Sequence, residues 1–280
     1  MAIVGWFSKK HFVYTIIFIK FEDVNHKCVT MIVVFIVFIL SVVITIVYEL
    51  YYYQSQKRQI IATVTPLSRG ESSERDLIYR LVKGGIPSST IFHDLYIPNK
   101  NGYTQVDLVI PTSVGIFMFE IKDYSGWIFG NANHNSWTQV LAYGQEKHHF
   151  YNPIKQNEGH ITALRNSAEQ LKNVPIYSII VFYGSSEIRK LSNVPANCWV
   201  VYPNKVVKLI RHIMENTPPA AYTDKWEIMQ ILKSAVENGN NEAIRFAHIQ
   251  KVQNAYSGKY HSTYTYTPHF FRFGRRRRIF

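Results

Sequence analysis

Gly115-Ile116-Phe117-Met118-Phe119-Glu120-Ile121-Lys122 decides the fold, because it has the composition of a buried β-strand. Branched and aromatic residues favour strands, and successive side chains of a strand point to opposite faces. Glu120 and Lys122 therefore share one face. The opposite face carries Phe117, Phe119 and Ile121, which we expect to pack in the core. A charged pair thus lies at the end of an apolar strand, where burial without partners would be costly.

A second strand-like segment, Tyr103 to Ile110, lies just before this one and contains Asp107. The segment Pro111-Thr112-Ser113 between the two predicts a turn, so we expect the strands to pair as a hairpin. In that hairpin Asp107 would approach Glu120 and Lys122. A simple salt bridge at the strand end is the alternative interpretation of the Glu-x-Lys spacing taken alone.

Two carboxylates and an amine in one place suit metal-assisted hydrolysis of a phosphodiester. Magnesium prefers oxygen ligands and retains several waters, so Asp107 and Glu120 would suffice as the protein's share of the coordination. One bound water would be the nucleophile, and Lys122 would orient it or offset charge on the phosphate. We therefore expect Mg²⁺, or Mn²⁺ in its place, as the cofactor.

Other motifs surround the hairpin. They are Gly70-Glu71-Ser72-Ser73-Glu74, Gln105-Val106-Asp107, Gly115-Ile116-Phe117, Phe119 to Gly126, Trp137-Thr138-Gln139 and Asn152-Pro153-Ile154-Lys155-Gln156. In order and spacing they resemble the nuclease-related domain family, NERD, over residues 66–215. That family is placed in the restriction-endonuclease-like superfamily, whose signature is written PD-(D/E)xK; Val106 stands where the signature has proline. The resemblance implies an α/β fold with a restriction-endonuclease-like mixed sheet flanked by helices.

The resemblance also implies roles for five residues. Asp107 and Glu120 would be metal ligands, and Lys122 would be the catalytic lysine. Gln156 would be a supporting polar residue on a later helix, and Glu74 a helix-borne acid. Together they imply a nuclease that acts on DNA or RNA.

Glu74 also has a structural interpretation. It lies in the first turn of a predicted helix, beside an apolar stripe that begins at Leu77. A carboxylate in the first turn suits the helix dipole, so capping and catalysis both stay open. Glu71 lies three residues earlier on the same face and is an alternative to Glu74.

Gln156 and His160 lie four residues apart on a helix that we expect to start near Pro153. Residues at this spacing share a side of the helix, so both can face the same cleft. For His160 alone, a surface or core role is the preferred interpretation.

Several histidines raise the question of zinc. His148 and His149 are adjacent and His134 is nearby, but the spacing matches no recognised zinc site. Cys28 and Cys198 are the two cysteines of the chain, and Cys28 lies in a hydrophobic segment. We therefore expect no zinc.

Residues 28–48 predict a transmembrane helix. The stretch carries no charged side chain, and it is long enough to cross the hydrocarbon core of a bilayer, about 30 Å thick. A cleaved signal peptide is disfavoured, because the stretch is too long and no small-residue cleavage site follows it. Tyr48, Tyr51, Tyr52 and Tyr53 follow instead and suit the membrane–water interface.

Charges around this segment do not decide its orientation. Lysines precede it at positions 9, 10, 20 and 27, whereas Lys57 and Arg58 follow it. Since nuclease chemistry needs nucleic acid and two cysteines offer no disulfide framework, we place the carboxyl-terminal domain in the cytoplasm. The prediction is a single-pass protein of the cell membrane.

The formal net charge of +12, from 31 basic and 19 acidic residues, favours polyanionic partners. Part of this excess lies in the tail at residues 257–280, where aromatic residues lead into Arg275-Arg276-Arg277-Arg278. The tail suits nucleic acid, through stacking and phosphate contacts, and equally an anionic lipid surface. Both alternatives stay open.

The remaining chain continues as α/β. We expect strands at Tyr177 to Phe182 and at Trp199 to Tyr202, and helices at residues 161–171 and 205–214. Asp224 and Glu227 resemble a capping box that opens a further helix through Val236, and another helix is expected at residues 242–254. Apolar stripes in these two helices, expected in the core, comprise Trp226, Met229, Leu232, Phe246, Ile249 and Val252.

The expected organisation has six parts: a tail at 1–27, the membrane helix at 28–48, a linker at 49–65, the nuclease-related domain at 66–215, helices at 216–256 and the basic tail at 257–280. The predicted function is metal-dependent phosphodiester hydrolysis by a membrane-anchored protein. The alternative is a catalytically inactive protein that binds nucleic acid or acts as a scaffold at the membrane.

Overall fold

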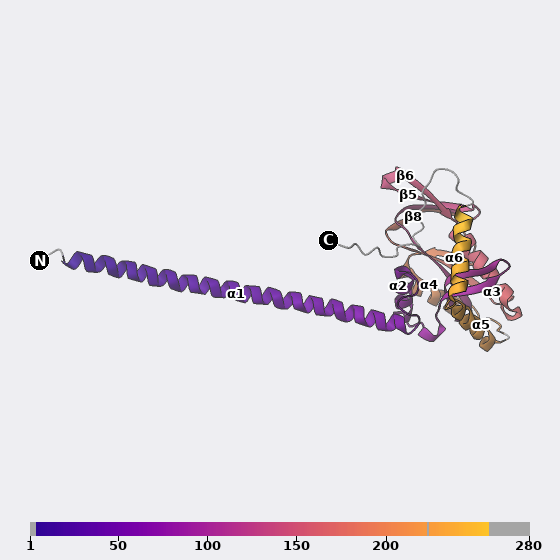
Figure 1. Ribbon diagram of the computed structural model, residues 1–280, viewed down its shortest axis with the longest axis horizontal. Coiled ribbons are helices and arrows are strands. Elements are labelled where there is room, and N and C mark those ends of the chain that lie inside the picture. The colour runs from indigo at the N-terminus through magenta and orange to yellow at the C-terminus, as the bar shows by residue number, and fades with distance from the viewer. Residues whose placement is uncertain (1–3, 223, 258–280) are drawn as a thin grey trace. The chain divides into compact units, whose positions relative to one another are not determined.

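The computed structural model describes residues 4–222 and 224–257 (Figure 1). Its described residues form two compact units that divide after Gln59. The predicted basic tail therefore lies almost wholly outside the described residues.

Helix α1, Val4–Ala62, makes up the described part of the first unit (Figure 1). Its last residues, from Ile60 to Ala62, belong to the second unit. Residues 29–62 include a window with a mean hydropathy of 3.2, none of which is buried in the protein. Within it the hydroxyls of Ser41 and Thr45 donate to helix carbonyls at 2.7 and 2.9 Å, so they need no water. Within the part of the chain that the structure describes, one helix is thus long and apolar enough to cross a membrane. Residues 49–62, predicted as a linker, continue this helix.

The second unit contains two mixed sheets. Sheet A has the strand order β1-β2-β3-β7-β9, and sheet B has the order β6-β5-β4-β8. The strands of sheet A are β1 (Phe92–Asn99), β2 (Gly102–Thr112), β3 (Gly115–Asp123), β7 (Ile176–Tyr183) and β9 (Cys198–Val201). Those of sheet B are β4 (Gly126–Asn131), β5 (Ser136–Leu141), β6 (Glu146–Tyr151) and β8 (Ser186–Ser192).

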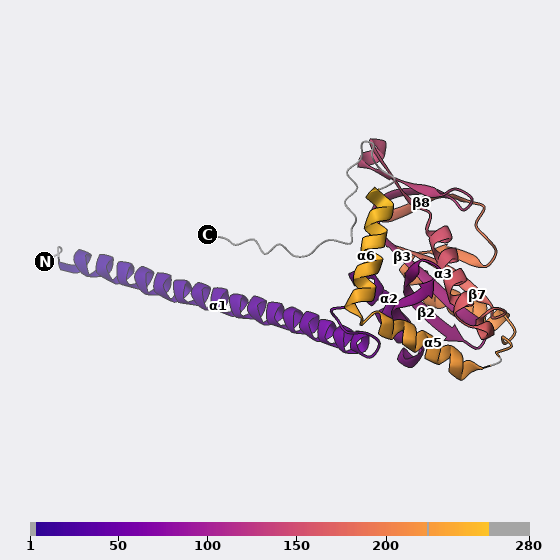
Figure 2. The same cartoon turned by 45° about the vertical axis from the view of Figure 1, so that its right-hand side comes forward.

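Helices cover both faces of sheet A (Figure 2). They are α2 (Ser72–Lys83), α3 (Pro153–Ser167), α4 (Pro203–Asn216), α5 (Lys225–Asn238) and α6 (Glu242–Ser257). On one face Phe117 and Phe119 of β3 pack with Leu77 of α2 and Val206 of α4. On the other, Met118 packs with residues of α3 and α5. The central strand β3 is therefore apolar on both sides except at its end.

Sheet B packs against the main sheet through its aromatic residues. The Trp137 ring of β5 stacks on Phe182 of β7, with ring centroids 6.1 Å apart and planes 3° apart. The Trp137 indole N–H donates to the carbonyl of Asn131 at 3.1 Å. The motif around Trp137 therefore supports the fold.

The predicted α/β fold with a mixed sheet and flanking helices is confirmed, and a second sheet was not predicted. The expected hairpin forms, with β2 and β3 antiparallel. Asp224 caps α5 by accepting the Glu227 N–H at 2.9 Å, as the capping box predicts.

The predicted core stripes of the last two helices are partly wrong. Trp226 is 71% exposed and Phe246 is 61% exposed. The buried residues of α5 are Ile228, Leu232 and Ala235, which pack with residues of β1. Trp226 lies on a different face of the helix and is therefore exposed.

Candidate active site

Asp107 and Glu120 lie where the β2–β3 ladder ends. Paired positions run from Thr112 opposite Gly115 to Leu108 opposite Phe119. One residue further, the Asp107 carboxylate accepts the backbone N–H of Ile121 at 2.7 Å. A side chain thus takes the place of the next strand-to-strand hydrogen bond, which fixes the Asp107 carboxylate beside the end of β3.

Glu120 and Lys122 form an ion pair on the α3 side of β3. The Lys122 Nζ lies 2.6 Å from Glu120 Oε1, and their side chains are 18% and 2% exposed. Lys122 also donates to Gln156 Oε1 of α3 at 3.1 Å. Strand alternation places the two charges together, and the helix supplies the amide that holds the lysine.

His160, one helical turn after Gln156, is also part of this cluster. Its Nε2 lies 3.2 Å from Glu120 Oε2, and its Nδ1 lies 2.8 Å from Thr104 Oγ1. Both oxygens of Glu120 therefore have a partner. The preferred sequence interpretation, a surface or core role, missed this contact.

The charge state of Glu120 follows from these partners. Burial acts to raise the pKa of the carboxyl, but Lys122 and His160 outweigh it and hold the pKa below its ordinary value. Glu120 is therefore a carboxylate at neutral pH.

Asp107 differs. Burial, together with the negative charges of Glu120 and Glu74, raises the pKa of Asp107 well above its ordinary value. Lys122 and the Ile121 N–H offset only part of this. The site thus carries more acidic groups than its one lysine can balance.

Lys122 is an ammonium in this setting. Burial disfavours its charge, but the Glu120 carboxylate more than compensates and raises the pKa of Lys122 above its ordinary value. The lysine can therefore donate hydrogen bonds and supply positive charge, and it is not a base at neutral pH.

Two buried asparagines place α3, and with it Gln156 and His160. Asn152 caps the helix by accepting the Ile154 N–H at 2.9 Å, and Pro153 occupies the first turn. Asn157 donates to the Met118 carbonyl of β3 at 3.0 Å and to Ser178 Oγ of β7 at 2.9 Å. The Asn-Pro-x-x-Gln motif therefore combines a helix cap with a residue of the site.

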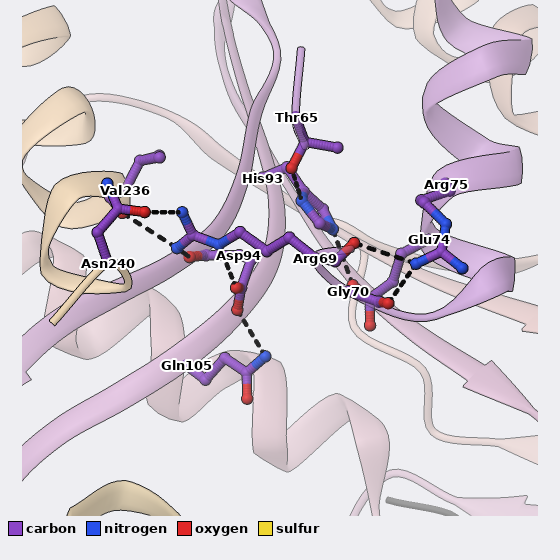
Figure 3. Close-up of polar contacts among 10 residues, drawn as sticks. All are labelled: Thr65, Arg69, Gly70, Glu74, Arg75, His93, Asp94, Gln105, Val236 and Asn240. Carbon is purple, nitrogen blue, oxygen red and sulfur yellow. Dashed lines mark hydrogen bonds and ion pairs between the residues drawn. The ribbon is translucent and has the colours of Figure 1, made fainter. Parts of the chain in front are cut away.

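Glu74 is buried at the start of α2, but its direct partner is a histidine (Figure 3). His93 Nε2 of β1 lies 2.8 Å from Glu74 Oε2, and His93 Nδ1 lies 3.0 Å from Thr65 Oγ1. Glu74 still influences the site, because its charge helps to raise the pKa of Asp107. Glu71, the alternative, is the N-cap residue of α2 and gives no side-chain cap.

Arg69 ties the neighbouring strand to the last helices (Figure 3). Its Nε lies 2.5 Å from Asp94 Oδ2, and it donates to the Val236 carbonyl and to Asn240 Oδ1, both at 3.0 Å. Gln105 donates to the other Asp94 oxygen at 2.8 Å. Arg69 thus links β1, through Asp94, to the end of α5 and the residues that follow it.

Asp107 and Glu120 are the residues that could hold a divalent cation, because their negative charges lie close enough for Glu120 to raise the pKa of Asp107. Hard cations take such oxygens and fill the remaining positions with water. Among the described residues, no group of three or more His, Cys, Asp or Glu side chains is arranged to hold a metal ion. The protein's share of the coordination would therefore be two carboxylates.

The structure brings Asp107, Glu120, Lys122 and Gln156 together and places Glu74 close enough to act electrostatically on Asp107. His93 was not singled out from the sequence as the partner of Glu74. One signal was present, because two polar residues, His93 and Asp94, interrupt the apolar residues of β1.

Comparison with known proteins agrees with these observations. The chain is 28% identical over 153 residues to an uncharacterized protein of Bacillus anthracis, a match covering 54% of this chain and 70% of the relative. No solved structure gives a significant match. Residues 69–183 match the model of the NERD family, the nuclease-related domain. Glu74, Asp107, Glu120, Lys122 and Gln156 all lie within the segment that is similar to the nuclease-related domain.

Proposed function

We propose that the protein is a metal-dependent nuclease that hydrolyses phosphodiester bonds of DNA or RNA. The observation that supports this most is the meeting of Glu120, Lys122 and Gln156 beside Asp107 at the end of the β2–β3 ladder. A second carboxyl, Asp107, whose pKa is raised by burial and by neighbouring carboxylates, is the kind of group that functional sites gather.

Asp107 and Glu120 would hold Mg²⁺ or Mn²⁺. Such a cation, when bound, lowers the pKa of water and withdraws charge from a phosphate. Lys122, already charged, would donate to a phosphate oxygen and offset the negative charge that develops there. Gln156 would hold the lysine in place through its 3.1 Å hydrogen bond, and Glu74 would add negative charge near Asp107.

The test is cleavage by the full chain in detergent micelles, with single- and double-stranded DNA and RNA as substrates. Wild type should cut with Mg²⁺ or Mn²⁺ and not with a chelator. Lys122→Ala should lose about 100-fold or more of this activity, because a preorganised charge at the phosphate is lost.

Lys155→Ala is the matched control. Lys155 precedes Gln156 and contacts Asn135 at 2.8 Å, away from the acidic cluster, so its loss should leave cleavage within a few-fold. Cleavage that persists in chelator, or an unaffected Lys122→Ala, would rule out this mechanism. Binding of nucleic acid without cleavage would favour the inactive scaffold.

We also propose that α1 anchors the domain in the cell membrane as a single span, with the carboxyl-terminal domain in the cytoplasm. The apolar window of residues 29–62 supports the span. A reporter enzyme that works only outside the cytoplasm, fused after Phe280, should be inactive. Reporter activity would contradict the proposed orientation.

Nucleic acid is the proposed partner of the domain, in keeping with the net charge of +12. The predicted contacts of the basic tail, with nucleic acid or with anionic lipid, remain proposals. Deleting the tail, residues 257–280, separates them. Loss of salt-sensitive liposome binding would indicate lipid, and loss of nucleic-acid binding would indicate the other partner.

A further inference from the structure

Two buried histidines contact carboxylates in the same way, although they lie on different elements. His93, on β1, is 2% exposed and lies between Thr65 and Glu74 (Figure 3). Its Nδ1 is 3.0 Å from the threonine Oγ1, and its Nε2 is 2.8 Å from Glu74 Oε2.

His160, on α3, repeats this order. It is 6% exposed, its Nδ1 is 2.8 Å from Thr104 Oγ1, and its Nε2 is 3.2 Å from Glu120 Oε2. Each triplet therefore runs from a threonine hydroxyl through an imidazole to a carboxylate. Neither threonine is near its histidine in sequence, so local chain geometry does not produce the repeat.

The carboxylate contact fixes what Nε2 does. An ionised carboxylate only accepts, so Nε2 carries a hydrogen and donates to it; Nδ1 accepts the threonine O–H in the neutral ring and donates to the threonine oxygen in the imidazolium. A group that donates in this way sets the rotation of the carboxylate and leaves its other lone pairs free. In Glu120, the oxygen that does not contact His160 is available to Lys122, whose Nζ lies 2.6 Å away.

The Glu74–His93 contact also lies under a tight turn. A Cβ at Gly70 would come within 2.4 Å of Glu74 Oε2 and 2.5 Å of His93 Cε1. The backbone of Gly70 has a φ of +70°, which glycine adopts readily. The turn thus packs directly against this pair.

We propose that His93 and His160 are positioning residues of the active site, which orient the Glu74 and Glu120 carboxylates and are themselves oriented by Thr65 and Thr104. The proposal rests on the proposed nuclease function. Each histidine acts through its carboxylate, and neither touches the substrate.

The experiment measures Mn²⁺ binding to the full chain in detergent, by calorimetric titration, separately from cleavage. His160→Leu removes the donor to Glu120 and should weaken Mn²⁺ binding about 10- to 100-fold. His93→Leu should weaken it less and lower turnover, because Glu74 reaches Asp107 only through its charge.

Rescue separates orientation from mere filling of space. His160→Gln and His93→Gln keep an N–H near the position of Nε2, and each should recover to within about threefold of wild type. Thr104→Val should cause a loss of about 2- to 10-fold that Thr104→Ser does not, because only serine keeps the hydroxyl. His134→Leu, at an exposed position, is the control and should leave binding unchanged.

Three results would overturn the proposal. The leucine variants could bind Mn²⁺ as wild type does, or the glutamine variants could bind it no better than the leucine variants. The leucine variants could also be unfolded already in chelator, before Mn²⁺ is added, so that unfolding alone explains their weaker binding. Failure of the proposed function is distinguishable. A wild-type chain that binds Mn²⁺ and cuts nothing overturns the nuclease alone, and the positioning role is then judged by binding. A wild-type chain that binds no Mn²⁺ overturns both.

Discussion

The two buried histidines, His93 in sheet A and His160 in α3, differ in burial and partners from the histidines of sheet B. His93 and His160 are buried, and each contacts a buried carboxylate. His148 and His149 of β6 are exposed. His148 lies 3.6 Å from Glu146, but the two side chains are 45% and 60% exposed, so the pair contributes little.

His149 makes the comparison sharper, because it too contacts a threonine. Its Nδ1 lies 3.2 Å from Thr138 Oγ1 on the neighbouring strand, in an exposed setting. Among the described residues the structure gives His149 no carboxylate partner. A threonine–histidine contact alone therefore does not make a site. Burial and a carboxylate on the second nitrogen distinguish His93 and His160.

The largest expected effect comes from disturbing the packing around His93. Gly70→Ala places a Cβ in contact with Glu74 and His93 and also requires a left-handed backbone. The two costs together should lower the free energy of unfolding by about 2–4 kcal/mol. Urea unfolding of the full chain in micelles, followed by fluorescence, measures it.

Gly102→Ala is the control for this experiment. Gly102 also has a positive φ, of +110°, but nothing lies within 4 Å of the position of its Cβ. Its substitution should cost about 1 kcal/mol through the backbone alone. Equal losses at the two positions would mean that the turn at Gly70 does not press on the histidine–carboxylate pair.

A smaller effect is expected on Tm, where neutralising Asp107 and neutralising Glu120 should cause changes of opposite sign. The folded-state pKa of Asp107 is raised, so the stability it contributes is present below its unfolded pKa and is lost as pH rises through the folded pKa. Asp107→Asn removes this loss. With chelator at pH 7.5 it should therefore raise Tm by about 2–4 °C, and the gain should shrink toward pH 4.

Glu120→Gln should do the opposite. The pKa of Glu120 is lowered by Lys122 and His160, so its contribution is present above the unfolded pKa and is lost as pH falls through the folded pKa. The substitution should lower Tm at pH 7.5 by a few degrees, and less in acid. A shift of the same sign for both variants would contradict the charge balance described for the site.

The sequence was most informative where local patterns decide structure. Alternation along Gly115–Lys122 predicts the common face of Glu120 and Lys122, and the turn before it predicts the hairpin that brings Asp107 near. The start of α3 at Pro153 follows from helix-start chemistry. These features depend on residues that are close in sequence, so one sequence without relatives is enough to predict them.

Long-range contacts were not predictable in the same way. Thr65 lies in the connection between α1 and α2, Glu74 in α2 and His93 in β1, and a single sequence does not reveal their pairing. The short strands of sheet B were missed because few of their residues are buried, so they show no sustained alternation. Trp226 was misplaced because a large apolar residue in a capped helix was assumed to face the core.

The smallest expected effect is at His149. His149→Leu removes an exposed contact with Thr138 that involves no buried carboxylate, so Tm should change by less than about 2 °C and Mn²⁺ affinity by less than about twofold. The same calorimetric titration and thermal unfolding used for His160→Leu measure both quantities. A loss at His149 as large as that at His160 would show that the threonine contact itself matters. In that case burial beside a carboxylate would no longer distinguish the two regions.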